Sequence, residues 1–129
     1  MEKQKINLTE AEWNIMECLW EQNPKTGREI VKQLQVQKGW SRSTILTLLR
    51  RLEEKEAVGS ESTGALKQFY QLITRESAAM QETKDFLQRV YNGSLGMMVS
   101  AFTKKQNLSK SEIDELYAIL NELEMKVDD

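Results

Sequence analysis

The chain has 129 residues, 40% of them hydrophobic and 29% charged, with a net charge of −2 and a single cysteine, Cys18. Its length suits one domain or one small domain with an appendage, and the lack of histidine and of a second cysteine in the sequence removes the commonest general base and any cysteine-cluster metal site. Since no apolar run approaches the ~20 residues that cross a bilayer and no signal-peptide core follows the first residues, we expect a cytoplasmic protein that is not an enzyme and binds no metal or cofactor.

Helix starts are marked by capping boxes, in which Ser or Thr and a Glu three residues later each satisfy a backbone N–H of the first turn. The boxes are Thr9 with Glu12, Thr26 with Glu29, and Ser109 with Glu112. Apolar residues frame the first and third boxes as hydrophobic staples, and Trp40 and Ile45 frame Ser41 in the same way. This pattern predicts helices that begin near residues 10, 27, 42 and 110.

Three short helices are predicted in the first half of the chain, over residues 10–22, 27–35 and 42–55. Asn23-Pro24 ends the first, because proline cannot continue a helix, and Gly39 separates the second from the third. The apolar side chains at helical spacing, predicted to face inward, are Trp13, Met16, Leu19, Trp20, Ile30, Val31, Leu34, Ile45, Leu48, Leu49 and Leu52. We interpret Trp13, Trp20 and Trp40 as core anchors rather than base-stacking platforms. Cys18 is interpreted as a small, partly buried side chain, with redox sensing as the minor alternative.

The apolar period changes after residue 57. Runs with β propensity at 58–62 and 67–72 flank Thr63-Gly64-Ala65-Leu66 and predict a hairpin. A long helix then begins at Thr74 or Ser77 and reaches Tyr91, and further helices are predicted over 95–104 and 110–124. The predicted fold is mostly α with a small β-hairpin wing, in which a winged helix-turn-helix domain over residues 1–74 precedes a helical domain over residues 75–129.

The predicted third helix has the composition of a DNA-reading element. Its outward face carries hydroxyls, arginines and a leucine, which suit base edges, phosphates and a thymine methyl. The segment 25–55 holds eight basic residues against three acidic ones, and residues 76–129 hold six against ten. An amphipathic helix with a merely solvated outer face is the alternative. The predicted DNA-binding residues are Arg42, Ser43, Thr44, Leu46, Thr47, Arg50 and Arg51, with Lys67 as the phosphate contact of the wing.

The C-terminal apolar residues allow two interpretations. These helices could fold back onto the N-terminal domain, or they could pair with the same helices of a second chain. Helix-turn-helix proteins commonly bind two half-sites as two-fold dimers, so we favour a homodimer on double-stranded operator DNA. The predicted dimerisation residues are Leu95, Met98, Val99, Phe102, Ile113, Leu116, Tyr117 and Leu120. The alternative from another class is a winged-helix module that binds a protein, without sequence-specific DNA binding.

The residues of these elements resemble the penicillinase-repressor family of BlaI, MecI and CopY. The matching residues are, in order, Leu8–Trp13, Met16, Leu19–Trp20, Trp40–Leu52, Tyr70, Val90–Ser94, Phe102, Leu108–Ser109, Glu112–Ile113, Leu116 and Ile119–Leu120. The resemblance implies a winged-helix domain, a C-terminal dimerisation domain of three helices, and repression of promoters that carry a TACA/TGTA-like inverted repeat. It also implies that Thr44 and Thr47 are recognition-helix threonines and that Arg51 is the family's nearly ubiquitous arginine.

Three positions in or beside the predicted recognition helix depart from the family pattern. The family pattern often has lysine where this chain has Ser43 and a basic residue where it has Leu46. The operator of this chain is therefore expected to differ in detail from those of its relatives. Glu56 stands where the family pattern has a glycine that ends the recognition helix. The junction between this helix and the wing is therefore expected to differ too.

The mode of inactivation also varies within the family. The β-lactam-responsive members are cut in the dimerisation domain, which implies a membrane sensor-protease system as a partner and Ala101-Phe102 as the aligned bond. The family pattern has asparagine before Phe102, and this chain has Ala101. The copper-responsive members carry paired C-terminal cysteines, so we expect no copper sensing of that kind from a chain with Cys18 alone.

Overall fold

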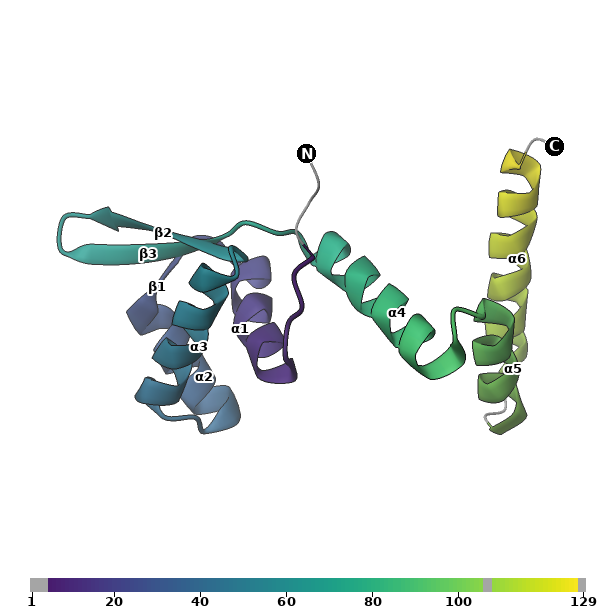
Figure 1. Cartoon of the computed structure of the whole chain (residues 1–129), viewed down its shortest axis with the longest axis horizontal. Helices are drawn as coiled ribbons and strands as arrows, with labels where there is room; N and C mark the ends of the chain where they lie inside the picture. The colour runs from purple at the N-terminus through teal and green to yellow at the C-terminus, as the bar shows by residue number, and fades with distance from the viewer. Residues whose placement is uncertain (1–4, 106–107, 128–129) are drawn as a thin grey trace. The chain divides into compact units, whose positions relative to one another are not determined.

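The computed structural model describes residues 5–105 and 108–127, which form helices and one small sheet (Figure 1). The elements are α1 (Glu10–Glu21), β1 (Lys25–Thr26), α2 (Gly27–Lys38), α3 (Arg42–Glu54), β2 (Val58–Thr63), β3 (Leu66–Gln71), α4 (Arg75–Tyr91), α5 (Leu95–Lys105) and α6 (Lys110–Lys126). The chain divides into two compact units, Met1–Asp85 and Phe86–Asp129, and the division falls inside α4. The functional boundary between residues 74 and 75 stays a prediction.

The cap geometry confirms the helix starts that the capping boxes predict. Thr9 Oγ1 accepts the N–H of Glu12 at 3.1 Å, while Glu12 Oε1 accepts the N–H of Thr9 at 2.8 Å, and the same reciprocal pair starts α2 and α6. α2 continues to Lys38, beyond the predicted end at Gln35, because only Gly39 adopts the left-handed backbone (φ 70) that stops it.

The predicted hairpin is confirmed, with β2 and β3 paired from Val58–Gln71 to Thr63–Leu66. Gly64 supplies the positive φ (65°) of the two-residue turn. β1 was not predicted from the sequence, because two residues carry no alternation of polar and apolar side chains. It pairs with β3 and gives the antiparallel order β1-β3-β2.

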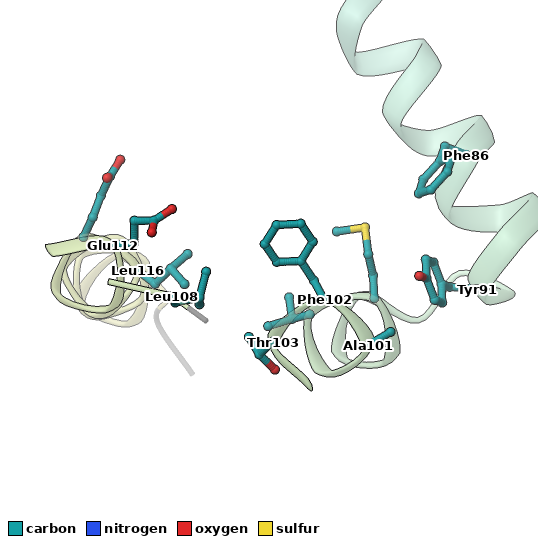
Figure 2. Close-up of a pocket in the computed structure, with 11 residues that line it drawn as sticks. Phe86, Tyr91, Ala101, Phe102, Thr103, Leu108, Glu112 and Leu116 are labelled. Carbon is teal, nitrogen blue, oxygen red and sulfur yellow. The ribbon is translucent and has the colours of Figure 1, made fainter. Parts of the chain in front are cut away.

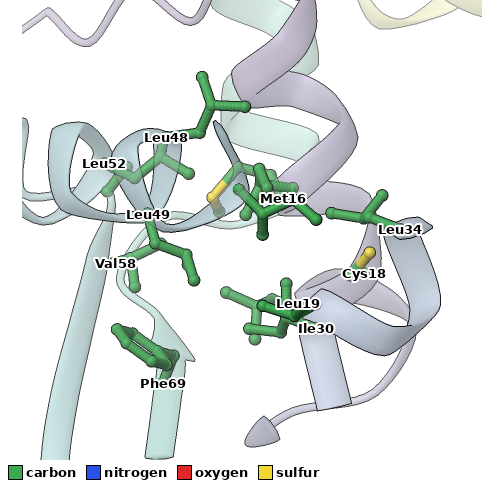
Figure 3. Close-up of a cluster of buried hydrophobic side chains, with 14 residues drawn as sticks. Met16, Cys18, Leu19, Ile30, Leu34, Leu48, Leu49, Leu52, Val58 and Phe69 are labelled. Atoms are coloured by element: carbon green, nitrogen blue, oxygen red, sulfur yellow. The ribbon is translucent and has the colours of Figure 1, made fainter. Parts of the chain in front are cut away.

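The core of the first unit lies where α1, α2 and α3 meet the base of the hairpin (Figure 3). Its buried members are Ile15, Met16, Cys18, Leu19, Ile30, Val31, Leu34, Ile45, Leu48, Leu49, Leu52, Ala57, Val58 and Phe69. The predicted inward faces of α2 and α3 are therefore confirmed. Trp20 and Trp40, predicted as core anchors, are half-buried and pack against this core. For Trp13 the prediction was wrong: its ring is half-buried outside the core, where its indole N–H donates to Glu17, and Ile15 fills the core instead.

Glu56 ends α3 with a left-handed backbone (φ 63). The N–H of Glu56 donates to Glu53 O and the N–H of Ala57 to Leu52 O, each at 3.0 Å, which is the hydrogen-bond pattern of a Schellman motif. A residue with a Cβ costs about 1–2 kcal/mol in this conformation, whereas glycine adopts it freely. The backbone thus accounts for the glycine that the family pattern has at this position.

The second half of the chain buries few side chains. Ala78 is the buried residue of α4, and all the described side chains of α5 and α6 are exposed or half-buried. The mostly helical fold with a small antiparallel sheet and a hairpin wing is confirmed. The predicted apolar faces of the last helices exist, and within the second unit little covers them.

Candidate nucleic-acid interface

The inner face of α3 fixes which side chains its outer face presents. With Ile45, Leu48, Leu49 and Leu52 buried, the opposite side of the helix is turned to solvent. The predicted contact residues on α3 that are exposed are Arg42, Ser43, Thr44, Leu46, Arg50 and Arg51, and Thr47 is half-buried. Leu46 is 37% exposed although it is apolar, so its side chain is available to an apolar group outside the chain.

Hydroxyl groups cluster at the N-terminus of α3. Ser41 Oγ accepts the backbone N–H of Thr44 at 3.2 Å and donates to Thr44 Oγ1 at 3.0 Å. Ser43 Oγ lies 3.2 Å from the same Ser41 oxygen. The cap therefore also orients the two hydroxyls that are predicted to read bases.

A groove of about 390 Å³ runs between α3 and the wing, and it is lined by four basic residues, one of which was not predicted as a contact. Its charged residues are Arg28, Arg42, Arg50, Lys67 and Glu53, and its apolar residues include Leu46, Leu49 and Phe69. Arg28, near the N-terminus of α2, was counted among the basic residues but was not predicted as a contact. Only the packing of α2 beside the hairpin could reveal its place, because the two segments are far apart in sequence.

Lys67 lies along β3, paired with Ser62, rather than at the tip of the hairpin. Its Nζ is 3.7 Å from Glu53 Oε1 and 5.2 Å from the centroid of the Phe69 ring. Glu53 also accepts a 2.8 Å hydrogen bond from Ser60 Oγ, so one carboxylate links α3 to both strands of the wing. The phosphate contact assigned to Lys67 stays a prediction.

A buried carboxylate joins the C-terminal end of α3 to α1. Glu12 is 1% exposed, and Lys55 Nζ donates to its Oε1 at 2.5 Å and to Asn7 O at 2.8 Å. Burial raises the pKa of Glu12, but the hydrogen bonds from Lys55 and Thr9 and the charge of Lys55 outweigh it, so the pKa lies below its ordinary value. Glu12 Oε2 is buried with no hydrogen-bond partner in the part of the chain described.

Cys18 is more deeply buried than predicted, at 2% exposure. Burial raises the pKa of its thiol, which donates to Asn14 O at 3.5 Å. A thiol with little thiolate character and no solvent access reacts slowly with oxidants, which argues against the redox alternative. Among the described residues no three His, Cys, Asp or Glu side chains are grouped to hold a metal ion, and no helix there is long and apolar enough to span a membrane.

A cavity of about 670 Å³ lies within the second unit, between the end of α4, α5 and α6. Figure 2 shows Phe102 of α5 on one side of this space, with Leu108 and Leu116 on the other. The predicted dimerisation residues are exposed except Met98, which is half-buried. Ala101-Phe102, the bond aligned with the family's cleavage site, lies inside α5 with both side chains exposed. Neither assignment is tested by this geometry, so both stay predictions.

The sequence as a whole matches a known family. The family model described as "Penicillinase repressor" matches residues 8–122. The chain is 32% identical over 121 residues to the methicillin resistance regulatory protein MecI of Staphylococcus aureus (strain N315), which covers 94% of this chain and 98% of that protein. It is 34% identical over 115 residues to the penicillinase repressor of Bacillus licheniformis, covering 89% and 90% of the two chains.

Two solved structures are similar to this chain at 27% sequence identity. The DNA-binding domain of the repressor BlaI has a TM-score of 0.53 and covers 57% of this chain and 90% of its own. The monomeric form of Bacillus licheniformis BlaI in complex with the blaP half-operator has a TM-score of 0.52, with coverages of 58% and 92%. In the second of these structures the similar protein is bound to DNA.

Proposed function

Because this chain belongs to the penicillinase repressor family, we propose that it is a transcriptional repressor that binds an inverted-repeat operator as a homodimer. The family match over residues 8–122, which bears out the resemblance inferred from the sequence, carries the proposal. The structure supports it with a helix whose exposed face is rich in hydroxyls and arginines, beside a wing. No catalytic role is proposed, and we place the protein in the cytoplasm.

The outer face of α3 would enter the major groove. Ser43, Thr44 and Thr47 would contact base edges, since a hydroxyl bonds to either donors or acceptors. Leu46 would meet a thymine methyl. Arg50 and Arg51 would contact phosphates or guanine. Arg28, which lines the groove between α3 and the wing, joins them as a proposed phosphate contact.

The homodimer is proposed on the exposed apolar surface of the C-terminal helices. Leu95, Phe102, Leu116 and Leu120 are each more than two-fifths exposed, and the cavity between α5 and α6 is lined mainly by apolar side chains. Contiguous exposed apolar surface of this kind marks an interaction site. A two-fold dimer would cover it and place two winged helices on the two halves of an inverted repeat.

The test begins with selection of the preferred duplex from a random pool, followed by gel-shift titration at several salt concentrations. Thr47→Ala should relax preference at one base position, with a loss of about tenfold on the selected site. Arg51→Ala should weaken binding to all sequences and flatten the salt dependence if it contacts a phosphate. Thr83→Ala and Arg89→Ala, which remove the same groups from α4, are the matched controls. Unchanged affinity and preference in both α3 variants would contradict the proposal.

The same selection distinguishes the proposed repressor from the alternative, a winged-helix module that binds a protein. A protein-docking winged helix would show no salt-dependent affinity for any duplex and would bind its partner without nucleic acid. A TACA/TGTA-like inverted repeat among the selected duplexes would support the family type of operator. The membrane sensor-protease partner implied by the resemblance stays a prediction, and cleavage at Ala101-Phe102 would be its signature.

A further inference from the structure

The start of α4 is tied to α1 by a tryptophan and an ion pair. Trp13 and Glu17 are one helical turn apart on α1. Glu17 Oε1 accepts hydrogen bonds from Trp13 Nε1 and from Arg75 Nε, each at 3.0 Å. The Arg75 guanidinium also lies 6.0 Å from the centroid of the Trp13 ring. Since Arg75 is the first residue of α4, these contacts hold the beginning of that helix.

Neighbouring contacts hold the chain on both sides of this point. Trp20 Nε1 donates to the carbonyl of Ile73 at 3.0 Å, and its ring meets that of Trp13 edge-on with centroids 5.1 Å apart. Further along α4, Lys5 forms an ion pair of 2.8 Å with Asp85. All of these residues belong to the first compact unit, so the direction in which α4 leaves the winged helix is fixed inside that unit.

We propose that Trp13, Glu17 and Arg75 are positioning residues that set the separation of half-sites the repressor accepts. This inference rests on the proposed function, because separation matters only when two DNA-binding units are joined. α4 is one continuous helix that begins in the first unit and ends in the second. Half-sites of a two-fold dimer lie about one helical turn of DNA apart, or a multiple of it. The path of α4 away from each winged helix therefore limits the half-site separations at which the two winged helices of the dimer can bind DNA at the same time.

The contacts suit positioning better than folding. The side chains of Glu17 and Arg75 are 44% and 58% exposed, and an exposed ion pair contributes little to folding stability. Neither residue belongs to the apolar core or to the outer face of α3. Their loss should leave the fold and the binding of a single half-site nearly unchanged, while the start of α4, held only by its remaining contacts, reorients more easily.

The experiment uses the full chain with three kinds of duplex: the selected operator, the same operator with base pairs inserted between its halves, and a single half-site. Glu17→Ala and Arg75→Ala should bind the half-site like the wild type but lose about tenfold in affinity for the selected operator, because the effective concentration of the second winged helix of the dimer falls. Their affinities should also differ less between half-site separations. Glu17→Gln should keep the wild-type profile, since its amide oxygen still accepts both hydrogen bonds. Glu10→Ala, which removes an acid elsewhere on α1, is the matched control.

The possible results separate this inference from the function on which it rests. A wild-type separation profile in both alanine variants would overturn the positioning role while half-site binding still upheld the repressor. No salt-dependent binding by the wild-type chain would overturn the repressor itself. Should an alanine variant unfold, Trp13→Phe removes the indole N–H that bonds to Glu17 and replaces the indole by a smaller aromatic ring. This variant should broaden the profile in the same direction, and an unaltered profile would count against the inference.

Discussion

Between residues 10 and 71, the inward faces of three helices and the base of a hairpin bury a continuous apolar core, whereas in the described parts of α5 and α6 no side chain is buried. Both regions carry apolar residues at helical spacing. Amphipathic periodicity therefore identifies a face that must be covered but does not say whether the cover comes from the same chain. In the first region it does; in the second we propose that it comes from another copy.

Among the substitutions that test this comparison, the largest change in the free energy of unfolding should come from the buried core of the first region. Leu52→Ala truncates a fully buried side chain on the inner face of α3, and the cavity it leaves should lower the free energy of unfolding by about 3 kcal/mol. Leu66→Ala removes the same atoms from an exposed position on β3 and should change it by less than about 0.5 kcal/mol. Urea denaturation at fixed protein concentration measures both. Equal effects would show that the buried cluster does not hold the first unit together.

The second region should respond through association instead. Leu116→Asp places a charge on the exposed apolar surface of α6 and should weaken the dimer by about 2 kcal/mol, or roughly thirtyfold in Kd. Asn121→Asp adds the same charge to an exposed polar position of that helix and is the control. Sedimentation equilibrium over a dilution series would reveal the change. A wild-type chain that is monomeric at micromolar concentration would refute the proposed pairing.

A smaller effect within the first unit concerns its buried charge. Lys55→Met leaves the Glu12 carboxylate buried without its cation and should lower the free energy of unfolding by about 1.5 kcal/mol at neutral pH. Because the pKa of Glu12 is below its ordinary value in the folded chain, this contribution is complete above the ordinary pKa and is lost as the pH falls through the folded one. The difference between the two proteins should shrink below about pH 4.3, which thermal melts across acidic buffers would record. A difference that grows on acidification would contradict this account.

The smallest effect should be a gain. Glu56→Gly relieves the left-handed backbone at the end of α3 and should stabilise the first unit by about 1 kcal/mol. Glu54→Gly, two residues earlier at the last position of the right-handed helix, should instead destabilise the first unit by a similar amount. Thermal unfolding of the three proteins side by side is sufficient. A lower melting temperature for Glu56→Gly would mean that the side chain makes a contribution larger than its strain.

Local chemistry made much of the first unit predictable from sequence. Capping boxes gave the starts of α1, α2 and α6 to the residue, because both partners of each box lie within one turn. The buried face of α3 followed from four apolar residues at helical spacing. The exposed residues of its outer face followed in turn, since burying one side of a helix exposes the other.

What the sequence did not reveal depends on tertiary packing. β1 exists because β3 passes beside Lys25 and Thr26, and Arg28 reaches the groove for the same reason. The spacing predicts Trp13 as a core residue, yet its ring is only half-buried outside the core and its indole N–H donates to Glu17. A helical wheel assigns a direction to each side chain but not the depth at which a large ring comes to rest.

The burial of Cys18 has a practical consequence for measuring how two copies sit on DNA. A thiol at 2% exposure, with its pKa raised by burial, should stay unmodified by maleimides and thiol-directed spin labels at neutral pH. The sequence contains no other cysteine, so one introduced at Val36, which is 81% exposed on α2, would be the single reactive position in each chain. The unaltered protein then serves as the unlabelled control. The distance between two such labels on one operator measures the separation of the winged helices.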